Sequence, residues 1–365
     1  MKGNGADDRR FMQLALALGR RGLGNTWPNP AVGAVIVRDG IVVGRGWTQA
    51  GGRPHAEVEA LRRAGEAARG ATLYVTLEPC SHHGKTPPCA DAIIAAGIAR
   101  VVSALEDPNP LVAGQGHARL RARGIAVEVG LEADAARRAH AGHIRRVTDG
   151  RPHVTLKLAV SADGKAGLAG RRPVAITGER ARDRVHRMRA MNDAVLVGIG
   201  TAIADDPLLT CRLPGMRSPV RVVLDPALKL PPTSRLVQTA RDVPVWVLAR
   251  SDAATEAAQR LQAHGVSVFH VAGNAGIDLD AALALLAREG VTWLMVEGGP
   301  KVAAALLKAD LVDEAALFEA PETLGADAID ALEGLPLDAL RKSSFLKETG
   351  AEAVGVDRLE TFERR

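Results

Sequence analysis

The segments 55-HAEVEAL-61 and 76-TLEPCSHHGKTPPC-89 decide the fold of the first part of this chain. They hold one histidine and two cysteines, His55, Cys80 and Cys89, close to the ends of apolar runs. An imidazole and two thiolates form a ligand set typical of a zinc ion that keeps its fourth position open. The two segments therefore predict a layered α/β domain built around a catalytic zinc site.

A carboxyl group accompanies these ligands, because Glu57 lies two residues after His55, near a predicted helix start. Zinc lowers the pKa of a bound water from about 15.7 to about 7, and a nearby carboxyl group can carry protons from the water to a leaving amine. H-x-E followed by P-C and a second cysteine is the order found in zinc deaminases of nucleobases, although here eight residues separate the two cysteines. One alternative stays open at this point, a structural zinc whose fourth ligand is His82 or His83.

Around this site the sequence alternates short apolar runs with helical patterns, which predicts a layered α/β domain. Asp39-Gly40 joins two apolar runs, and this dipeptide is a strong signal for a β-hairpin. The expected strands are 31–38, 41–47, 71–77, 100–104 and 125–129, and the expected helices include 54–64 and 89–96.

The segment 147–152, VTDGRP, combines turn-forming residues with a proline and is interpreted as a linker. We therefore expect two domains, residues 1–148 and residues 149–365. A second α/β series follows the linker, with expected strands at 153–160, 194–198, 220–225, 243–249, 266–271 and 291–297.

Two glycine-rich turns in the second half follow expected strands. GIGT at 198–201 lets a backbone approach a ligand closely, and EGGP at 297–300 opens an apolar helix whose N-terminus can receive a phosphate. Neither is the GxGxxG pattern of a Rossmann domain. Taken alone, GxGT is a weak signal that more commonly marks a tight structural turn.

Composition limits the function classes. The 365 residues are 47% hydrophobic, and 47 basic residues against 42 acidic ones give a mild net charge of +5. Aromatic residues make up only 3%, too few for the stacking surfaces that single-stranded nucleic acid needs. No apolar run approaches the roughly 18 residues of a membrane span, and the N-terminus has the pattern of an amphipathic helix. We expect a cytoplasmic enzyme without nucleic-acid or membrane partners.

The first half resembles the deaminase half of the bifunctional riboflavin biosynthesis family. The resemblance rests on WPNPAVGAVIV (27–37), HAEVEAL and TLEPCSHHGKTPPCADAIIAAGIARVV (76–102). It implies a cytidine-deaminase-like three-layer αβα domain with His55, Cys80 and Cys89 as zinc ligands and Glu57 as the catalytic proton carrier. It also implies that Asn29 contacts the pyrimidine, although Asn29 beside two prolines is also a typical turn residue. The side chains of His82, His83 and Lys85 are expected to face the substrate and its phosphate, although a solvated loop explains each of them alone.

The second half resembles the pyrimidine reductase half of the same family, which has a dihydrofolate-reductase-like α/β fold. LKLAVSADGKA (156–166), VGIGTAIADDPLLTCR (197–212) and VEGGPKVAAALL (296–307) carry this resemblance. The NADPH-binding residues that it implies are Ala159, Thr201, Asp205, Gly299, Pro300, Lys301, Val302, Ala303, Ala304 and Ala305. The substrate-binding residues that it implies are Lys157, Arg189, Leu209, Arg212 and Glu297, with the two arginines expected at the ribose phosphate.

The chain departs from the family between its second-half motifs. Pro173 and Ala175 stand where the family often has a serine and a tryptophan, so the contacts of this loop with cofactor or substrate are open. Lys157 also has an alternative interpretation as a surface lysine at a strand edge. Cys211 has no zinc-binding partner near it in the sequence and is interpreted as a small packing residue.

The resemblance implies two reactions on one phosphoribosylated small molecule. Zinc-dependent hydrolytic deamination of 2,5-diamino-6-ribosylamino-4(3H)-pyrimidinone 5′-phosphate comes first, and NADPH then reduces the ribosyl side chain to ribityl. One zinc per chain and a homo-oligomer are expected. The alternatives are a nucleic-acid base deaminase with an accessory binding domain, which predicts a basic, aromatic-rich second half, and a zinc-stabilised binding module, which does not require Glu57. A further alternative is an inactive or weakened reductase half.

Overall fold

The computed structural model describes residues 5–82, 84, 87–110, 112–172, 174–274 and 276–365. The chain divides into two compact units, Met1–Gly150 and Arg151–Arg365, which are considered separately below. Among the described residues, no helix has both the length and the apolar character that crossing a membrane requires.

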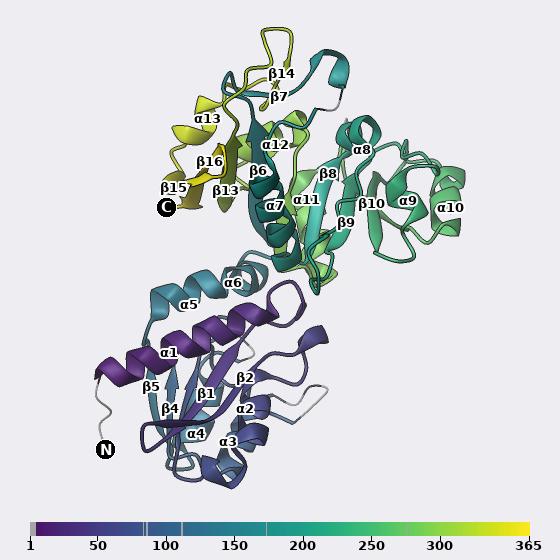
Figure 1. The fold of residues 1–365 in the computed structure, drawn as a ribbon. Coiled ribbons are helices and arrows are strands. Elements are labelled where there is room, and N and C mark those ends of the chain that lie inside the picture. The colour runs from purple at the N-terminus through teal and green to yellow at the C-terminus, as the bar shows by residue number, and fades with distance from the viewer. Residues whose placement is uncertain (1–4, 83, 85–86, 111, 173, 275) are drawn as a thin grey trace. The chain divides into compact units, whose positions relative to one another are not determined.

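The first unit is built on a five-stranded sheet in the order β2-β1-β3-β4-β5 (Figure 1). β1 is antiparallel to both β2 and β3, whereas β3, β4 and β5 run parallel. The strands are β1 (Gly33–Arg38), β2 (Ile41–Trp47), β3 (Thr72–Val75), β4 (Arg100–Ser103) and β5 (Ala126–Val129). The helices are α1 (Gly5–Gly19), α2 (Ala56–Ala64), α3 (Cys89–Ala95), α4 (Gln115–Arg121), α5 (Ala133–Ala139) and α6 (Ala141–Thr148).

Helices cover both faces of this sheet, which makes the unit a three-layer sandwich. α1 and α5 pack together on one face, and α2, α3 and α4 follow one another on the other face (Figure 1). Five of the six residues of β1 are buried, as expected for a strand with both faces covered. A Cβ at Gly33 would lie 1.8 Å from the carbonyl oxygen of Ala15 in α1, so this close approach requires glycine.

The hairpin expected at Asp39-Gly40 is confirmed. Both residues have positive φ, 51° and 77°, as a type I′ turn requires, and the two flanking strands pair antiparallel. The expected strands of this unit are all present, but most are shorter than expected. β1, for example, begins at Gly33 rather than at residue 31, because Val32 instead bonds through its N–H to the side chain of Thr48.

The second unit contains a nine-stranded sheet in the order β11-β10-β9-β8-β12-β6-β13-β16-β15. The strands from β11 to β13 are parallel, and β16 and β15 add an antiparallel edge. The strands of the unit are β6 (His153–Val160), β7 (Lys165–Gly167), β8 (Ala194–Gly198), β9 (Val220–Leu224), β10 (Val245–Arg250), β11 (Ser267–Val271), β12 (Trp293–Val296), β13 (Glu314–Glu319), β14 (Ile329–Asp330), β15 (Leu346–Val354) and β16 (Asp357–Arg364).

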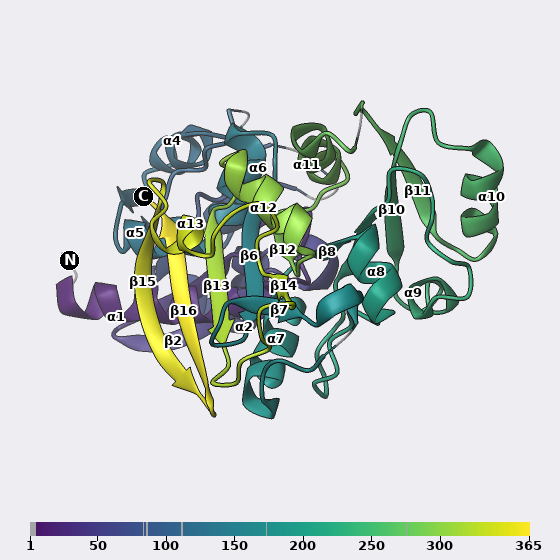
Figure 2. The same ribbon diagram turned by 90° about the horizontal axis from the view of Figure 1, so that it is seen from above.

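Helices again lie on both faces of the large sheet, with α7 on one side and α11 and α12 on the other (Figure 2). The helices are α7 (Glu179–Met191), α8 (Ile199–Asp205), α9 (Arg235–Gln238), α10 (Thr255–Ala263), α11 (Leu279–Arg288), α12 (Pro300–Lys308) and α13 (Asp338–Arg341). The order of the parallel strands positions the site. β12 lies between β6 and β8, so the loops after these three strands meet at one edge of the sheet, where open α/β sheets bind ligands.

Three parts of the second unit differ from the sequence-based expectation, and the first is the central strand β13, which is absent from the expected strands. α6 continues to Thr148 and β6 begins at His153, so the segment between the units is shorter than the expected 147–152. The long C-terminal hairpin of β15 and β16 was not expected strand by strand. Its signal is the two-residue loop Gly355-Val356, because a glycine with positive φ (73°) at the first position is typical of a type II′ turn.

Candidate active sites

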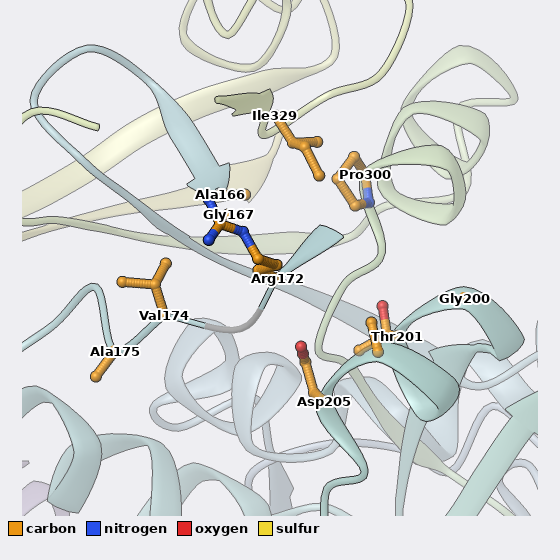
Figure 3. A pocket seen from close by; sticks show the side chains of 11 residues that line it. Ala166, Gly167, Arg172, Val174, Ala175, Gly200, Thr201, Asp205, Pro300 and Ile329 are labelled. Carbon is orange, nitrogen blue, oxygen red and sulfur yellow. The ribbon is translucent and has the colours of Figure 1, made fainter. Parts of the chain in front are cut away.

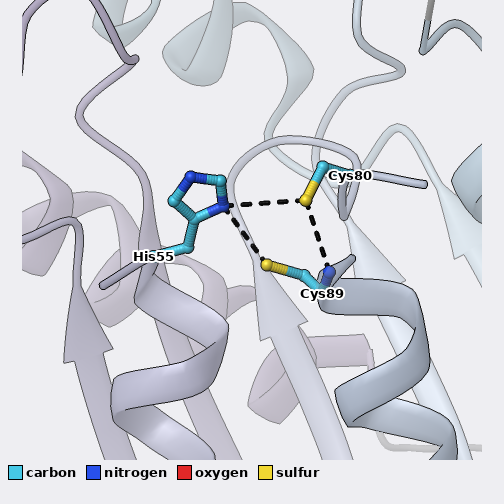
Figure 4. Close-up of side chains that lie close together, drawn as sticks. All are labelled: His55, Cys80 and Cys89. Atoms are coloured by element: carbon cyan, nitrogen blue, oxygen red, sulfur yellow. Dashed lines mark hydrogen bonds between the residues drawn. The ribbon is translucent and has the colours of Figure 1, made fainter. Parts of the chain in front are cut away.

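Three side chains from separate parts of the first unit meet in one cluster (Figure 4). The Nδ1 atom of His55 lies 3.3 Å from the Sγ atom of Cys89 and 3.7 Å from the Sγ atom of Cys80. All three possible ligand atoms fall within 4.8 Å of one another. Two sulfurs and one imidazole nitrogen this close together fit the coordination sphere of a zinc ion, which leaves room for a fourth ligand.

Local structure explains why these residues converge. His55 is the residue that precedes the first turn of α2, and Cys89 begins α3, so both stand at helix N-termini. Cys80 follows β3, and its sulfur accepts a hydrogen bond of 3.3 Å from the backbone N–H of Cys89. Hydrogen bonds from Cys89 and His55 lower the pKa of the Cys80 thiol, which favours the thiolate that binds metal.

Glu57 lies next to the cluster, in the first turn of α2, and is only 3% exposed. Burial raises the pKa of its carboxyl group, and the neighbouring Cys80 acts in the same direction. A carboxyl group in this environment holds a proton more readily than one in water, which is what a proton carrier needs.

The cluster opens into a cavity of about 180 Å³ that Glu57 and Asn29 also line. The side-chain amide of Asn29 donates a 2.8 Å hydrogen bond to the carbonyl oxygen of Gly52 and lies 3.4 Å from Nε2 of His55. Asn29 is therefore held at the wall of the cavity beside the metal cluster. Its expected contact with a pyrimidine stays a prediction.

The loop between the two cysteines is described only in part. His82 lines the cavity and is exposed, whereas His83 and Lys85 lie outside the described residues. The structure therefore leaves the expected contacts of these two side chains with substrate untested.

Sequence reasoning missed several other residues that line this cavity. Asp107, Asn109, His143 and Arg146 line it, and they come from the segment after β4 and from α6. A signal was available for the first two, because the polar run Asp-Pro-Asn-Pro directly follows a buried strand. Nothing in the sequence marks α6, which has the pattern of an ordinary amphipathic helix.

The carboxylate of Glu78 holds part of this lining in place. Its two oxygens accept hydrogen bonds from the backbone N–H groups of Asp107, Gly114 and His117, at 3.2, 2.9 and 3.1 Å. Because Glu78 stands two residues before Cys80, the same short segment carries a possible metal ligand and anchors the backbone at Asp107, which also lines the cavity.

The second unit brings four of the expected residues into one charged cluster. Arg189 forms a two-pronged ion pair with Glu297, with Nη2 to Oε2 at 2.7 Å, and its Nη1 donates to the carbonyl oxygen of Thr210 at 3.0 Å. Burial lowers the pKa of the nearby Lys157 amine, although Glu297 and Asp205 favour its charged form. Lys157 lies on β6 between β12 and β13, so the alternative of a strand-edge lysine is wrong.

A cavity of about 410 Å³ lies beside this cluster (Figure 3). Thr201, Asp205 and Pro300 line it, together with Ala166, Gly167, Arg172, Val174, Ala175, Gly200, Ala204 and Ile329. Arg172, Ile329 and the β7 residues were not expected here. Ala175 lines the cavity, so the departure from the family pattern at this position reaches the site, and Pro173 lies outside the described residues.

A second cavity, of about 520 Å³, is lined by residues of both glycine-rich turns and mainly by apolar groups. Gly299 has φ 77°, and a Cβ there would lie 3.0 Å from Oγ1 of Thr201. Gly299 is followed at once by Pro300, the first residue of α12, so free backbone N–H groups of the helix start lie at the cavity. A glycine cradle at a helix N-terminus fits the phosphates of a dinucleotide.

Not every expected residue reaches these cavities. Pro300, Lys301, Val302 and Ala305 line the second cavity, whereas Ala303 and Ala304 are buried on the other side of α12. Leu209 packs in the hydrophobic core, Ala159 packs against a core cluster, and Arg212 is exposed near His186. Side-chain contacts of Leu209, Ala159, Ala303 and Ala304 with a ligand therefore have no support in the described structure.

Protein-family models match both units. Residues 6–105 match the cytidine and deoxycytidylate deaminase zinc-binding region, and residues 152–358 match the RibD C-terminal domain. The molecule is thus a zinc-dependent deaminase of the cytidine-deaminase-like fold joined to an NADPH-dependent reductase. The chain belongs to the RibD family of riboflavin biosynthesis proteins.

Named relatives support this assignment over the full length. The riboflavin biosynthesis protein RibD of Aquifex aeolicus is 41% identical, with 98% of each chain covered, and that of Escherichia coli is 43% identical over 88% of this chain and 89% of the relative. The solved structure of Acinetobacter baumannii RibD superposes with a TM-score of 0.89 at 36% identity and covers 99% of this chain and 100% of that chain.

The name of a second relative with a solved structure gives both activities. The diaminohydroxyphosphoribosylaminopyrimidine deaminase/5-amino-6-(5-phosphoribosylamino)uracil reductase of Thermotoga maritima matches with a TM-score of 0.86 at 35% identity, and 99% of each chain is covered. The chain studied here is therefore a bifunctional deaminase and reductase of riboflavin biosynthesis, and zinc and NADPH are its cofactors.

Proposed function

We propose that residues 1–148 deaminate a phosphoribosylated diaminopyrimidinone and that residues 149–365 then reduce its ribosyl chain to ribityl. The substrate is 2,5-diamino-6-ribosylamino-4(3H)-pyrimidinone 5′-phosphate, in keeping with the activities named for the Thermotoga maritima relative. The single observation that carries the first assignment is the cluster of His55, Cys80 and Cys89, of which His55 and Cys80 line the same cavity as the buried Glu57.

In the deamination site, His55, Cys80 and Cys89 hold zinc, which when bound supplies an activated water. Glu57 is the proton carrier, because its buried carboxyl group lies beside the cluster and its pKa is raised. It takes a proton from the water and gives it to the departing amine, so the proton ends on ammonia. Asn29 orients the pyrimidine ring from the cavity wall.

In the reduction site, NADPH when bound supplies the hydride. Gly299 and the start of α12 hold its phosphates, and Thr201 and Asp205 line the adjoining cavity on the way to the charged cluster. Lys157, whose ammonium group is partly desolvated, donates a hydrogen bond to the sugar carbon–oxygen or carbon–nitrogen double bond and stabilises the charge that develops there.

The two arginines take different roles in this proposal. The guanidinium of Arg189 is already occupied by Glu297 and by the carbonyl oxygen of Thr210, so it fixes Glu297 for contact with substrate. Arg212 is exposed, and we assign it to the ribose phosphate because its guanidinium is suited to a phosphate contact. The partners of the protein are then small molecules, and we expect a homo-oligomer that works in the cytoplasm.

The zinc assignment makes a direct prediction. Cys80→Ser replaces a thiolate by a hydroxyl, a poor zinc ligand, so the bound metal should fall from about one zinc per chain to a small fraction of that. Elemental analysis of protein purified without added metal measures this content.

Cys211→Ser is the matched control, because Cys211 is a buried free cysteine of the second unit and belongs to no cluster of possible metal ligands found among the described residues. This control should keep its zinc. Full zinc content in the Cys80→Ser variant, or equal loss in both variants, would contradict the ligand assignment.

A further inference from the structure

A second group of possible metal ligands in the first unit shares no residue with the zinc cluster. It consists of Glu78, Glu106 and His117, and one ligand atom of each lies within 4.8 Å of the others. Glu78 follows β3, Glu106 follows β4 and His117 belongs to the first turn of α4. The fold therefore brings two carboxylates and an imidazole together from three separate segments.

The imidazole of His117 indicates that this group binds a ligand. His117 is 1% exposed, and neither Nδ1 nor Nε2 has a hydrogen-bond partner among the described residues. Leaving buried polar atoms unpaired costs free energy. The Nδ1 atom lies 3.8 Å from Oε2 of Glu78, too far for a hydrogen bond. A zinc ion with bonds of about 2.0–2.2 Å to a nitrogen and an oxygen holds those two atoms roughly 3–4 Å apart, which fits this separation.

The carboxylate of Glu78 is fixed in direction but not fully used. It accepts three backbone N–H groups, at 3.2, 2.9 and 3.1 Å. A carboxylate offers about four acceptor positions, so one stays available for a cation. Among the described residues, Glu78 forms no ion pair with a lysine or an arginine.

Glu106 supplies the second negative charge. Its Oε2 atom lies 3.5 Å from where a Cβ would stand at Gly114, the residue whose N–H binds Glu78. No lysine or arginine of the described residues pairs with Glu106. Arg121, one turn after His117 on α4, donates to the carbonyl oxygen of Val127 instead. Two carboxylates without a basic partner beside an imidazole attract a cation.

Burial of His117 does not prevent an ion from reaching it. Glu106 is exposed, so an ion can enter from solvent along this side chain. Cys89 of the zinc cluster is likewise only 1% exposed, because ligand atoms that lie against one another cover one another. One imidazole and two carboxylates suit zinc and similar divalent cations.

We propose that Glu78, Glu106 and His117 form a second site for a divalent cation of the zinc type. The ion joins the segment that carries Cys80 to the loop after β4 and to α4, and it stabilises the folded unit, to which alone it binds. The site lacks thiolates and one of its carboxylates is exposed, so it binds zinc more weakly than the first cluster does. Purification without added metal therefore removes this second ion.

The test measures zinc binding beyond the first ion. Untagged protein that already holds one zinc per chain is dialysed against increasing Zn²⁺, and elemental analysis gives the bound metal. The unmodified protein should take up about one further zinc per chain, and its melting temperature should rise with the zinc concentration. Glu106→Gln should weaken this uptake by about 10-fold or more, because a charged ligand is lost. Since Glu106 is exposed, the fold should not change.

His117→Phe keeps a ring of similar shape and removes both ring nitrogens. It should abolish uptake of the further zinc, while its melting temperature without added zinc stays equal or rises, since no ring nitrogen is left unpaired. Both variants should keep the first zinc, which shows that the unit is folded.

Glu66→Gln is the matched control, because Glu66 is an exposed glutamate of the same unit and belongs to no group of possible metal ligands found among the described residues. It should take up the further zinc as the unmodified protein does. The proposal would be overturned if the unmodified protein bound no further zinc, if Glu106→Gln or His117→Phe bound it with unchanged affinity, or if Glu66→Gln lost it equally.

Discussion

Replacing Glu57 by glutamine is expected to lower the rate of ammonia release by about 100-fold or more. The amide keeps the shape of the side chain but cannot take a proton from water or give one to the leaving amine. Zinc content should stay at about one per chain, because Glu57 is not among the three proposed ligands. NADPH oxidation with the deaminated intermediate should also be unchanged, because that reaction belongs to the second unit.

Glu59→Gln provides a matched control on the same helix. Glu59 is also buried, but it pairs with Arg62 at 3.0 Å and Arg63 at 3.6 Å and does not line the cavity. Its variant should release ammonia at close to the normal rate. If Glu59→Gln were as slow as Glu57→Gln, loss of helix stability rather than loss of a proton carrier would explain both, and the assignment of Glu57 would fail.

The second large effect is expected at Gly299, in the turn that we propose holds the phosphates of NADPH. Gly299→Ala should raise the dissociation constant for NADPH by about 10- to 100-fold, because the added methyl group meets Thr201 at 3.0 Å and keeps phosphate from the backbone N–H groups of α12. Fluorescence titration with NADPH measures this constant, and ammonia release should be unaffected.

Backbone strain has to be separated from this steric effect, because Gly299 has positive φ. Gly298 offers the comparison, since its φ is 96° and a Cβ there would meet nothing within 4 Å. Gly298→Ala therefore carries similar strain without blocking the cradle. It should lose thermal stability to a similar degree but keep most of its NADPH affinity. Normal affinity in folded Gly299→Ala protein would place the cofactor phosphates elsewhere.

Most of the central sheet strands could be predicted because buried strands leave a simple pattern in sequence. β6 and β8, for example, have the predicted bounds: β8 is a continuous apolar run, and in β6 apolar residues alternate with His153, Thr155 and Lys157 before the run ends. The C-terminal hairpin escaped because β15 is an exposed edge strand whose residues alternate weakly between polar and apolar. Such a strand is defined by its partner β16 rather than by its own composition.

The candidate sites likewise contain residues that the sequence predicts and residues that it does not. His55, Glu57, Cys80 and Cys89 could be predicted because metal and proton chemistry restricts residue type and spacing severely. His143 and Arg146, which line the same cavity, could not, since the fold decides which face of α6 lies at the cavity. The ion pair between Arg189 and Glu297 likewise joins residues 108 positions apart. Sequence alone identified both residues by resemblance but assigned Arg189 to phosphate.

The most direct test of the central claim, two independent reactions at two sites, follows ammonia release and NADPH oxidation separately in one protein preparation. With diaminopyrimidine substrate and no NADPH, ammonia should still be released. After zinc is removed by a chelator, that release should cease, while the deaminated intermediate should still oxidise NADPH at the original rate. NADPH oxidation that disappears together with the zinc in protein that remains folded, or ammonia release that requires NADPH, would contradict the account.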